Sequence, residues 1–264
     1  MTRPVRLAIS GASGRMGLAL LNLVRDDERF ELVRAVVSAQ SARLGKAAYG
    51  DVSALRFTGW DEPSGVDVVI DFSGPEGLAA ALDVCEATGA ALVTGTTGLD
   101  AAMEHRLAHA AERIAVLRAA NFSLGVAVLT RLLREASAAL PGWDIDIVEA
   151  HHNRKEDAPS GTALALGHAA AAGRDVKLED VAVYAREGRP GARELGTIGF
   201  AVVRGGDIVG EHQALIMGQG ERIELGHRAT DRSIFARGAL EAGAWIAGRA
   251  PGTWAIEDVI AAKV

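Results

Sequence analysis

Cysteine and long apolar runs are scarce in this sequence, and each scarcity excludes a class of protein. Cys85 is the one cysteine among 264 residues, so no internal disulfide forms, a reducing compartment fits, and Cys85 is expected to be a buried structural thiol. No stretch reaches the roughly 18 uncharged apolar residues of a membrane helix. The first apolar run, Val5–Ser10, is too short for a signal sequence because Gly11 ends it. We therefore expect a cytoplasmic protein that does not enter a membrane.

A surplus of positive charge is also absent. The sequence has 28 Lys and Arg residues against 34 Asp and Glu residues, a formal net charge of −6 at pH 7, which argues against a nucleic-acid-binding surface. Hydrophobic residues make up 49% and charged residues 23%, ordinary proportions that exclude long disordered stretches. The length allows one large domain or two smaller ones, each with a substantial core.

The first half of the sequence alternates β-branched runs with runs rich in alanine and leucine. Strands are expected at Val5–Ser10, Glu31–Ser38, Val66–Phe72, Ala90–Thr94 and Ile114–Ala119, and helices at Arg15–Arg25, Glu76–Thr88 and Asp100–Arg113. The first of these helices would have Met16, Leu20, Leu23 and Val24 on one face. This alternation predicts an α/β fold with a parallel sheet covered on both faces.

The pattern changes after Asn121. A long helix is expected at Gly125–Leu140, ending at Pro141, followed by a strand at Asp144–Ala150 and a short helix from Thr162. Further strands are expected at Val181–Tyr184, Thr197–Val203, Asp207–Ala214 and Glu221–Ala229, and a helix returns at the end of the chain. Runs of strands with few helices predict a second, α+β unit with a mostly antiparallel sheet.

A glycine-rich turn stands between the first expected strand and the first expected helix. It comprises Gly11, Gly14 and Gly17 in the segment GASGRMG. A pyrophosphate needs a tight turn, a backbone without obstructing side chains and amide groups at a helix start. The G-x-x-G-x-x-G spacing is less specific than G-x-G-x-x-G, and a turn that serves only packing is the alternative. Its position favours a dinucleotide site.

The acidic residue that usually contacts the ribose hydroxyls is absent. It should lie about 20 residues beyond the glycines, yet residues 34–42 contain no Asp or Glu, and Arg43 and Lys46 follow. A 2′-phosphate would meet no repulsion here. The sequence therefore favours NADPH slightly over NADH. One alternative is that the protein uses both cofactors equally well, and another is that Arg43 and Lys46 are ordinary surface cations.

The densest polar stretch, Glu149–Ala163, follows an apolar strand. Adjacent strand residues point to opposite faces, so His151 and His152 are unsuited to a shared metal, and no metal site is expected. Lys155 supplies a cation nearby. An imidazole and an ammonium group are suited to binding and protonating a small carboxylate.

The same stretch contains a helix start. Ser160 or Thr162 can cap the helix, and the amide groups there form an anion site. A capped surface helix beside ordinary loop charges is the alternative interpretation. Together with the histidines and the lysine, this start predicts a site for a carboxylate substrate.

Seven segments resemble one known family. EAHHNRKEDAPSGTALAL resembles the E-x-H-H-x-x-K-x-D-x-P-S-G-T-A signature of dihydrodipicolinate reductases. The other segments resemble that family in its order: GASGRMG at Gly11, DFSGPEG at Asp71, VTGTTGL at Val93, AANFSLGV at Ala119, GTIGFAVVRGGDIVGEH at Gly196 and GHRATDRSIFARGAL at Gly226. The resemblance covers essentially the whole chain.

This resemblance implies an architecture and an activity. The fold would be a Rossmann-like nucleotide-binding domain, residues 1–122 and 235–264, with an α+β substrate-binding and tetramerisation domain, residues 123–234, that has an open mixed sheet. The chain would form a homotetramer and would close at hinges near 121–125 and 229–235. The implied reaction is the NAD(P)H-dependent reduction of 4-hydroxy-tetrahydrodipicolinate, a small dicarboxylate, to tetrahydrodipicolinate in diaminopimelate and lysine biosynthesis.

The resemblance also implies site residues. The catalytic pair would be Lys155 as general acid and His151 as its acid–base partner or orienter. The substrate would contact His152, Lys155, Ser160, Gly161 and Thr162. The cofactor would contact Gly11, Ala12, Ser13, Gly14, Arg15, Met16, Ser38, Gly95, Thr96, Thr97, Ala119, Asn121 and Phe122. Ser38 stands where many relatives have an acid or an arginine, so it leaves cofactor preference open.

Three other functions compete with this one. Another imine or carbonyl reductase, such as an amino-acid dehydrogenase, is disfavoured because the HHxxK and PSGT elements occur together. A nucleotide-sensing regulator would have no use for an acid–base pair, and a turnover assay distinguishes such a regulator from an enzyme. A metal hydrolase is disfavoured by the shortage of well-spaced ligands, and metal analysis separates it.

Overall fold

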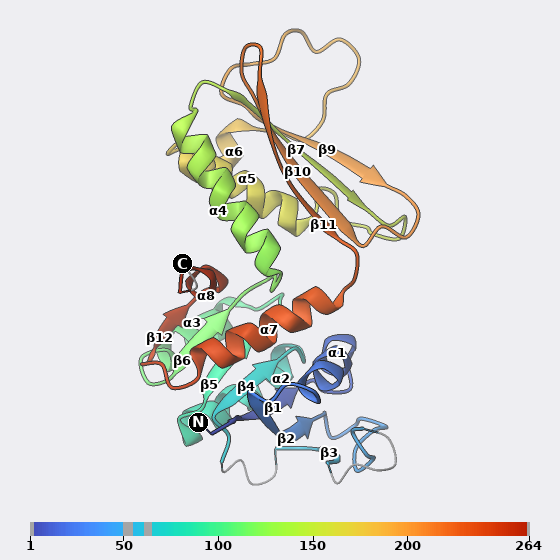
Figure 1. Ribbon diagram of the computed structural model, residues 1–264, viewed down its shortest axis with the longest axis vertical. Helices are drawn as coiled ribbons and strands as arrows, with labels where there is room; N and C mark the ends of the chain where they lie inside the picture. Colours follow the sequence, from blue (N-terminus) through green and yellow to red (C-terminus); the bar gives the residue numbers. More distant parts are fainter. Residues whose placement is uncertain (1–2, 50–54, 61–64, 263–264) are drawn as a thin grey trace. The chain divides into compact units, whose positions relative to one another are not determined.

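The computed structural model describes residues 3–49, 55–60 and 65–262, which form two compact units (Figure 1). One unit contains the chain up to Ser123 and again from Ser233 onward, and the other is the continuous segment Leu124–Arg232. The second unit is therefore inserted into the first. None of the helices in the described ranges combines the length and the apolar character that crossing a bilayer requires.

The first unit is built on a sheet whose described pairings are all parallel, in the order β12-β6-β5-β4-β1-β2-β3. The strands are β1 (Val5–Ser10), β2 (Phe30–Val36), β3 (Phe57–Thr58), β4 (Val68–Asp71), β5 (Ala91–Thr94), β6 (Ala115–Arg118) and β12 (Gly252–Trp254). The helices are α1 (Arg15–Val24), α2 (Pro75–Thr88), α3 (Ala101–Ala110), α7 (Ser233–Ile246) and α8 (Ile256–Ala261). The order runs outward from β1 in both directions, which places a ligand crevice at the carboxyl ends of β1 and β4.

Helices cover both faces of this sheet (Figure 1). α2 and α3 pack together on one face, and α1 and α7 pack together on the other. Strand side chains alternate between faces, so Val69 belongs to the α2–α3 core, whereas Ile70 lies against α7. A Cβ on Gly243 of α7 would come within 3.0 Å of the Ile70 side chain. The parallel α/β fold expected from the sequence is thereby confirmed.

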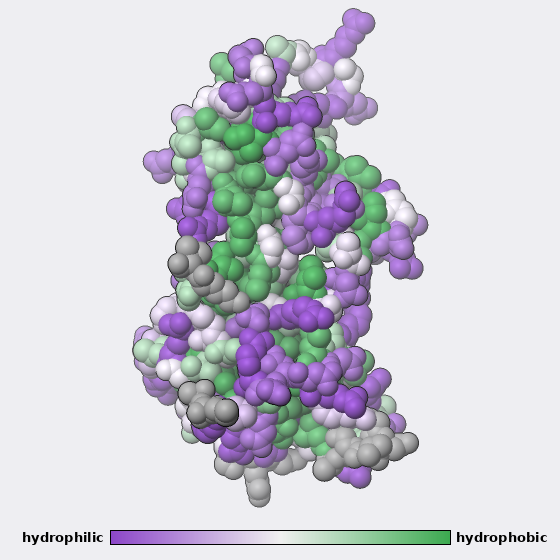
Figure 2. All heavy atoms as spheres, viewed as in Figure 1, coloured by the Kyte–Doolittle hydropathy of each residue, from purple (hydrophilic) through white to green (hydrophobic). Residues whose placement is uncertain are grey.

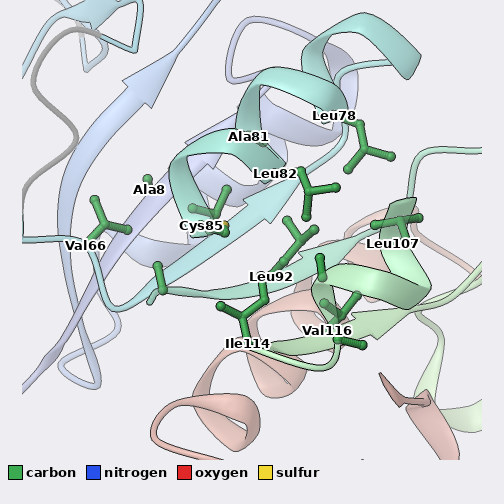
Figure 3. Packing of buried hydrophobic residues seen from close by; sticks show 14 residues of the cluster. Ala8, Val66, Leu78, Ala81, Leu82, Cys85, Leu92, Leu107, Ile114 and Val116 are labelled. Atoms are coloured by element: carbon green, nitrogen blue, oxygen red, sulfur yellow. The ribbon is translucent and has the colours of Figure 1, made fainter. Parts of the chain in front are cut away.

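The core between α2, α3 and the sheet consists of buried apolar side chains and one thiol (Figure 3). Leu82 and Cys85 of α2 lie over Leu92 of β5 and Val116 of β6. Cys85 has no exposed surface, and burial raises the pKa of its thiol far above the ordinary value. The prediction of a buried structural thiol is confirmed, because a thiol that stays protonated is a poor nucleophile.

Local sequence sets the ends of these helices. α2 begins at Pro75 and ends before Gly89, whose φ of 76° is left-handed. Asp100 caps α3 by accepting a hydrogen bond of 2.8 Å from the Met103 amide. Strands β3 and β12 were not expected from the sequence, because two or three residues carry no periodicity.

The second unit contains a mixed sheet in the order β11-β10-β7-β9-β8. Its elements are α4 (Leu124–Ala139), β7 (Asp144–His151), α5 (Gly161–Gly173), α6 (Leu178–Val181), β8 (Ala182–Val183), β9 (Ile198–Arg204), β10 (Gly210–Met217) and β11 (Arg222–Ala229). β10 is antiparallel to β7 and β11, whereas β9 is parallel to β7 and β8. The open mixed sheet implied by the resemblance is confirmed. The residue pattern alone predicted a mostly antiparallel sheet and missed the parallel pairing of β9 with β7, which exists because the helical crossover through α5 returns the chain in the same direction.

Three expected elements of this unit have different bounds. The strand expected at residues 181–184 is the end of α6 followed by the short β8. The strand expected at residues 207–214 begins later, at Gly210, because Gly206 has a φ of 52° and the chain turns there. The helix expected to be short extends to Gly173, since its alanine-rich second half favours helix.

One face of the mixed sheet is covered and the other is open. α4 and α5 pack on the covered face (Figure 1). The inward residues include Ile145, Ile147, Ala214 and Ile216. The outward residues include Val148, Ala150, Val203, Leu215 and Met217, which are partly or well exposed. In the described part of this unit, all three helices contribute to the inward core, so the outward face keeps its apolar residues at the surface.

α4 also presents apolar residues at its surface. Val128 and Leu132 are 44% and 45% exposed, and residues four apart share one face of a helix. Figure 2 shows hydrophobic residues on the visible surface where α4 lies in Figure 1. The second unit therefore has exposed apolar surface on a helix as well as on its sheet.

Candidate active site

Close backbone approaches build the turn between β1 and α1. Gly11 has a φ of 75°, and a Cβ there would lie 2.6 Å from the Phe72 carbonyl oxygen. A Cβ on Gly17 would overlap the Gly11 carbonyl oxygen. Because α1 meets the turn at Gly17, its buried face contains Gly17, Leu20, Leu21 and Val24. Met16 and Leu23, expected on one face with Leu20 and Val24, are partly buried.

The turn itself requires glycine at positions 11 and 17, but it does not require glycine at position 14. Gly14 is exposed and precedes α1 as an N-cap without a side-chain hydrogen bond. A Cβ there would lie 3.2 Å from the Gly11 carbonyl oxygen and would meet no other atom within 4 Å. The first amide groups of a helix are donors without helical partners and favour an anion. Gly14 therefore keeps the start of α1 open to a phosphate group.

A cavity of about 290 Å³ opens beside this turn. It is lined by Arg15, Met16, Phe72, Ser73, Gly74, Gly95, Thr96 and Thr97. Five of these, Arg15, Met16, Gly95, Thr96 and Thr97, were predicted to contact the cofactor. The segment 72–74 was not predicted, although it lies within the DFSGPEG motif. The cavity therefore joins the first turn to the loops after β4 and β5, as a dinucleotide site requires.

A buried carboxylate joins those two loops. Asp71, at the end of β4, accepts hydrogen bonds from the hydroxyls of Ser73, Thr94 at 3.1 Å and Thr96 at 2.7 Å. Asp71 has no exposed surface. The Thr96 hydroxyl is thus used within the protein, and its contribution to the cavity is to hold the loop after β5 in place.

Three other predicted residues belong to the first turn and to the end of β2. Ala12 is buried, and its amide donates a hydrogen bond of 2.9 Å to the Val36 carbonyl. Ser13 lies in the turn between the first two glycines. Ser38 is exposed just beyond β2. Ala12 and Ser13 therefore shape the turn, whereas Ser38 stands at the surface without lining the cavity.

The last three residues predicted for the cofactor follow β6. Ala119 is partly buried, and its amide donates to the Thr94 carbonyl at 3.2 Å. The Asn121 side chain accepts a hydrogen bond of 2.8 Å from the Ser123 amide. The Phe122 ring is 2% exposed and meets the Phe72 ring edge-on, 5.4 Å between centroids. Phe122 thus supports a wall of the cavity rather than lining it.

The second cluster begins at the end of β7. His151 is 9% exposed, and its Nδ1 lies 2.6 Å from a carboxylate oxygen of Glu149. Both side chains are on the inward face of the strand, because they are two residues apart. Glu149 also accepts two hydrogen bonds of 2.8 Å from the Arg204 guanidinium and one of 3.0 Å from the Ser160 amide.

These partners keep Glu149 ionised. Burial by itself opposes the charged form of the carboxyl group. The hydrogen bonds from Arg204, His151 and the Ser160 amide outweigh that burial, so the pKa of Glu149 lies below its ordinary value. A buried, charge-paired carboxylate therefore stands directly behind the imidazole of His151.

A second histidine approaches from β10. The His212 ring meets the His151 ring edge-on, 5.1 Å between centroids, and its Nε2 lies 3.0 Å from the Ser160 hydroxyl oxygen. Burial, followed by the nearby His151, lowers the pKa of His212 to about 4, so it is neutral at neutral pH. The Ser160 hydroxyl also accepts a hydrogen bond from the Ala163 amide at 3.2 Å. Ser160, predicted to contact substrate, thus caps α5 and is 2% exposed.

Lys155 lies on the loop that follows β7. Its ammonium nitrogen is 2.7 and 2.8 Å from the two carboxylate oxygens of Asp157. The Asp157 side chain is 59% exposed, and exposed ion pairs contribute at most about 1 kcal/mol. A carboxylate ligand can therefore replace Asp157 as the partner of Lys155 at small cost.

The surroundings of His152 are cationic. Partial desolvation, and then the positive charges of Arg232, Arg154 and Lys155, lower the pKa of His152. Gly161 and Thr162 form the first turn of α5 in the same segment, where backbone amides favour an anion. The end of β7 therefore offers an imidazole, several cations and a helix start to a ligand with more than one carboxylate.

Sequence reasoning missed several residues of these clusters. Glu149 could have been found, because a strand places residues 149 and 151 on the same face. Arg204 and His212 carry no local signal, since only the pairing of β9 and β10 with β7 brings them to Glu149 and His151. Asp71 likewise depends on a contact between two strand ends.

Two family models match the chain. The model described as dihydrodipicolinate reductase, N-terminus, matches residues 5–122, and the model described as dihydrodipicolinate reductase, C-terminus, matches residues 125–260. A 4-hydroxy-tetrahydrodipicolinate reductase of Thiobacillus denitrificans is 47% identical over 265 residues, covering 98% of this chain and 99% of the relative. One from Caulobacter vibrioides is 45% identical over 268 residues, covering 100% of both.

Solved structures share the fold. Dipicolinate-bound dihydrodipicolinate reductase from Paenisporosarcina sp. TG-14 has a TM-score of 0.77 at 24% identity, covering 97% of this chain and 99% of that one. Amine dehydrogenase from Mycobacterium smegmatis has a TM-score of 0.55 at 12% identity, covering 96% and 95%. At these identities the likeness shows the fold, and the roles of individual residues depend on the geometry described above.

Proposed function

The chain belongs to the dihydrodipicolinate reductase family, and we propose that its two clusters divide the reaction between cofactor binding and substrate protonation. It is a pyridine-nucleotide-dependent oxidoreductase that reduces 4-hydroxy-tetrahydrodipicolinate to tetrahydrodipicolinate on the route to diaminopimelate and lysine. The observation that carries the division is the location of the acid–base groups and the dinucleotide turn in different units.

The first unit binds the dinucleotide in this proposal. The start of α1 at Gly14 receives the pyrophosphate. The cavity lined by Arg15, Gly95 and Thr97 receives the nicotinamide side of the cofactor. The bound dinucleotide supplies a hydride to the unsaturated ring. Asp71 keeps the loops after β4 and β5 together around the cofactor.

The second unit binds the dicarboxylate and supplies the proton. Hydride addition leaves negative charge on the substrate, which a proton must neutralise. His151 is fixed on a buried carboxylate, whereas Lys155 is on a loop and pairs with an exposed carboxylate. This difference favours His151 as the proton donor and Lys155 as the cation that binds a substrate carboxylate. Gly161 and Thr162, at the start of α5, bind carboxylate oxygens with their amide groups.

The cofactor preference follows from the surface beyond β2. Ser38, Arg43 and Lys46 are exposed there, and residues 34–42 contain no acid that would repel a 2′-phosphate. We expect kcat/KM with NADPH to equal or exceed that with NADH when freshly generated substrate is assayed with both. Arg43→Ala should lower the NADPH value about two- to fivefold and leave the NADH value unchanged.

Two results would contradict this proposal in different ways. A clear preference for NADH would overturn the assignment of the 2′-phosphate surface. Turnover without any added pyridine nucleotide, or no turnover with either one, would overturn the proposed reaction as a whole.

The open sheet face supports a homotetramer assembled through the second unit. Apolar residues such as Val148, Val203 and Leu215 are left at the surface of the sheet, and an apolar face of this kind favours a second subunit. We expect sedimentation at micromolar concentration to give the mass of four 27.5 kDa chains. Val203→Glu should lower that mass, and Val176→Glu, an exposed apolar position outside the sheet, should leave it unchanged. A monomeric wild-type chain would rule the assembly out.

A further inference from the structure

Glu149 is a fully buried carboxylate with hydrogen-bonding partners on three other residues. Arg204 holds both of its oxygens, the Ser160 amide holds one, and Nδ1 of His151 lies 2.6 Å from the other. Burying a charge is costly unless it is paired and hydrogen-bonded. This buried charge lies directly behind the imidazole of His151, the group that donates the proton in the proposed function.

The carboxylate determines which nitrogen of His151 carries hydrogen. An ionised carboxylate only accepts hydrogen bonds, and the partners of Glu149 hold its pKa below the ordinary value. Nδ1 must therefore be the protonated nitrogen of a neutral His151, which leaves Nε2 as the atom that exchanges a proton. Gly210 provides the space at that atom, since a Cβ on Gly210 would lie 3.0 Å from Nε2.

We propose that Glu149 is a positioning residue for the reduction, and that it fixes His151 with hydrogen on Nδ1 so that Nε2 delivers the proton. The proposal rests on the proposed role of His151. In the step, the Nε2–H bond breaks as a substrate C–H bond forms, and its electron pair stays on Nε2. The proton neutralises the charge left by the hydride, and the imidazole ends neutral with its hydrogen on Nδ1.

Other groups near His151 do not replace this carboxylate. The titratable or charged groups that face it from its own strand, from β9, from β10 and from the following loop are Glu149, Arg204, His212, His152 and Lys155. Arg204 is engaged with Glu149, and His212 is neutral because burial lowers its pKa to about 4. Glu149 is therefore the anion among them that stabilises a protonated His151.

Glu149→Gln tests the proposal through the pH profile of kcat. The amide keeps the shape but removes the charge that favours the protonated imidazole. We expect kcat to fall about 10- to 100-fold and its alkaline limb to move to lower pH by about one unit or more. KM and nucleotide affinity should change little. Asp146→Asn is the matched control, because Asp146 is on the same strand, binds Arg193 at 3.0 and 3.1 Å, and lies on the opposite face; it should leave the limb in place.

The outcomes separate this inference from the proposed function. If His151→Ala leaves kcat intact, the proposed function fails. If His151→Ala lowers kcat but Glu149→Gln leaves the limb in place, or lowers kcat equally at every pH, the positioning role fails. Glu149→Asp, which retains the charge, should return the limb toward its wild-type position.

A measurement on the unaltered protein covers the case in which Glu149→Gln does not fold. Imidazole 15N shifts distinguish the two neutral forms of histidine, and the His151 signal is identified by its loss in His151→Ala. We expect hydrogen on Nδ1 at pH values where the imidazole is neutral. Hydrogen on Nε2 would overturn the inference whatever the variants do.

Discussion

We expect His151→Ala to lower kcat by about 10²–10⁴-fold, the usual contribution of a general acid–base group, while the nucleotide dissociation constant stays unchanged. The imidazole is lost, but the start of α5 and the cation at Lys155 remain to bind the substrate carboxylates. The dinucleotide turn lies in the other unit. Steady-state kinetics and calorimetric nucleotide titration check the two parts separately.

Lys155→Ala should mainly raise KM and should lower kcat less than His151→Ala does, because Lys155 binds a substrate carboxylate whereas His151 donates the proton. Hydrogen bonds to charged groups contribute about 1.5–3 kcal/mol, so losing the ammonium group should raise KM about tenfold or more. His109→Ala is a suitable control, because this histidine is on the surface of α3 and its side chain is 60% exposed.

The two variants can contradict the assignment in two ways. Near-normal kcat at saturating substrate in His151→Ala would mean that the proton comes from water or from another side chain. Damage confined to nucleotide binding would mean that the segment after β7 belongs to the cofactor site, and the division between the units would be wrong.

Gly14→Val should weaken nucleotide binding by about a hundredfold or more and leave both units folded. The added side chain would occupy the space where the pyrophosphate approaches the backbone. Within the protein itself the new Cβ meets only the Gly11 carbonyl oxygen, at 3.2 Å, so the turn can adjust. Gly11 and Gly17 are unsuitable for this test, because substitution there would distort the turn itself.

Gly142→Val is the control for that experiment. Gly142 is exposed after α4, and a Cβ there meets no atom within 4 Å, so its variant should bind nucleotide normally. Calorimetry compares the affinities, and thermal unfolding shows whether each variant remains folded. Unchanged nucleotide affinity in a folded Gly14→Val protein would refute the placement of the pyrophosphate at α1.

Features encoded in adjacent residues could be predicted from the sequence. The turn between β1 and α1 follows from three glycines at a strand-to-helix junction. The start of α5 was expected from Ser160 or Thr162 as its cap, and Ser160 is the residue that caps it. The five strands expected in the first half all occur as β1, β2, β4, β5 and β6. Each depends on local conformation and periodicity, which a single segment carries.

Features that depend on distant pairing could not be predicted. The direction of β9 relative to β7 is set by the crossover through α5, so the residue pattern alone suggested an antiparallel sheet. Arg204 reaches Glu149 because β9 pairs with β7 in a register that places it opposite His151. Asp71 is in a quoted motif, yet its contact with Thr96 exists only once β4 and β5 lie side by side.

The insertion of one unit into the other determines the order in which they can be completed during synthesis. A ribosome releases the whole segment from Leu124 to Arg232 before α7 exists, so the unit that begins second is finished first. Until α7 and β12 emerge, the nascent parallel sheet exposes Ile70 on one face and β6 at one edge. Unpaired edges and exposed apolar faces invite aggregation. Translation of the last part of the chain is therefore the step that protects the first part.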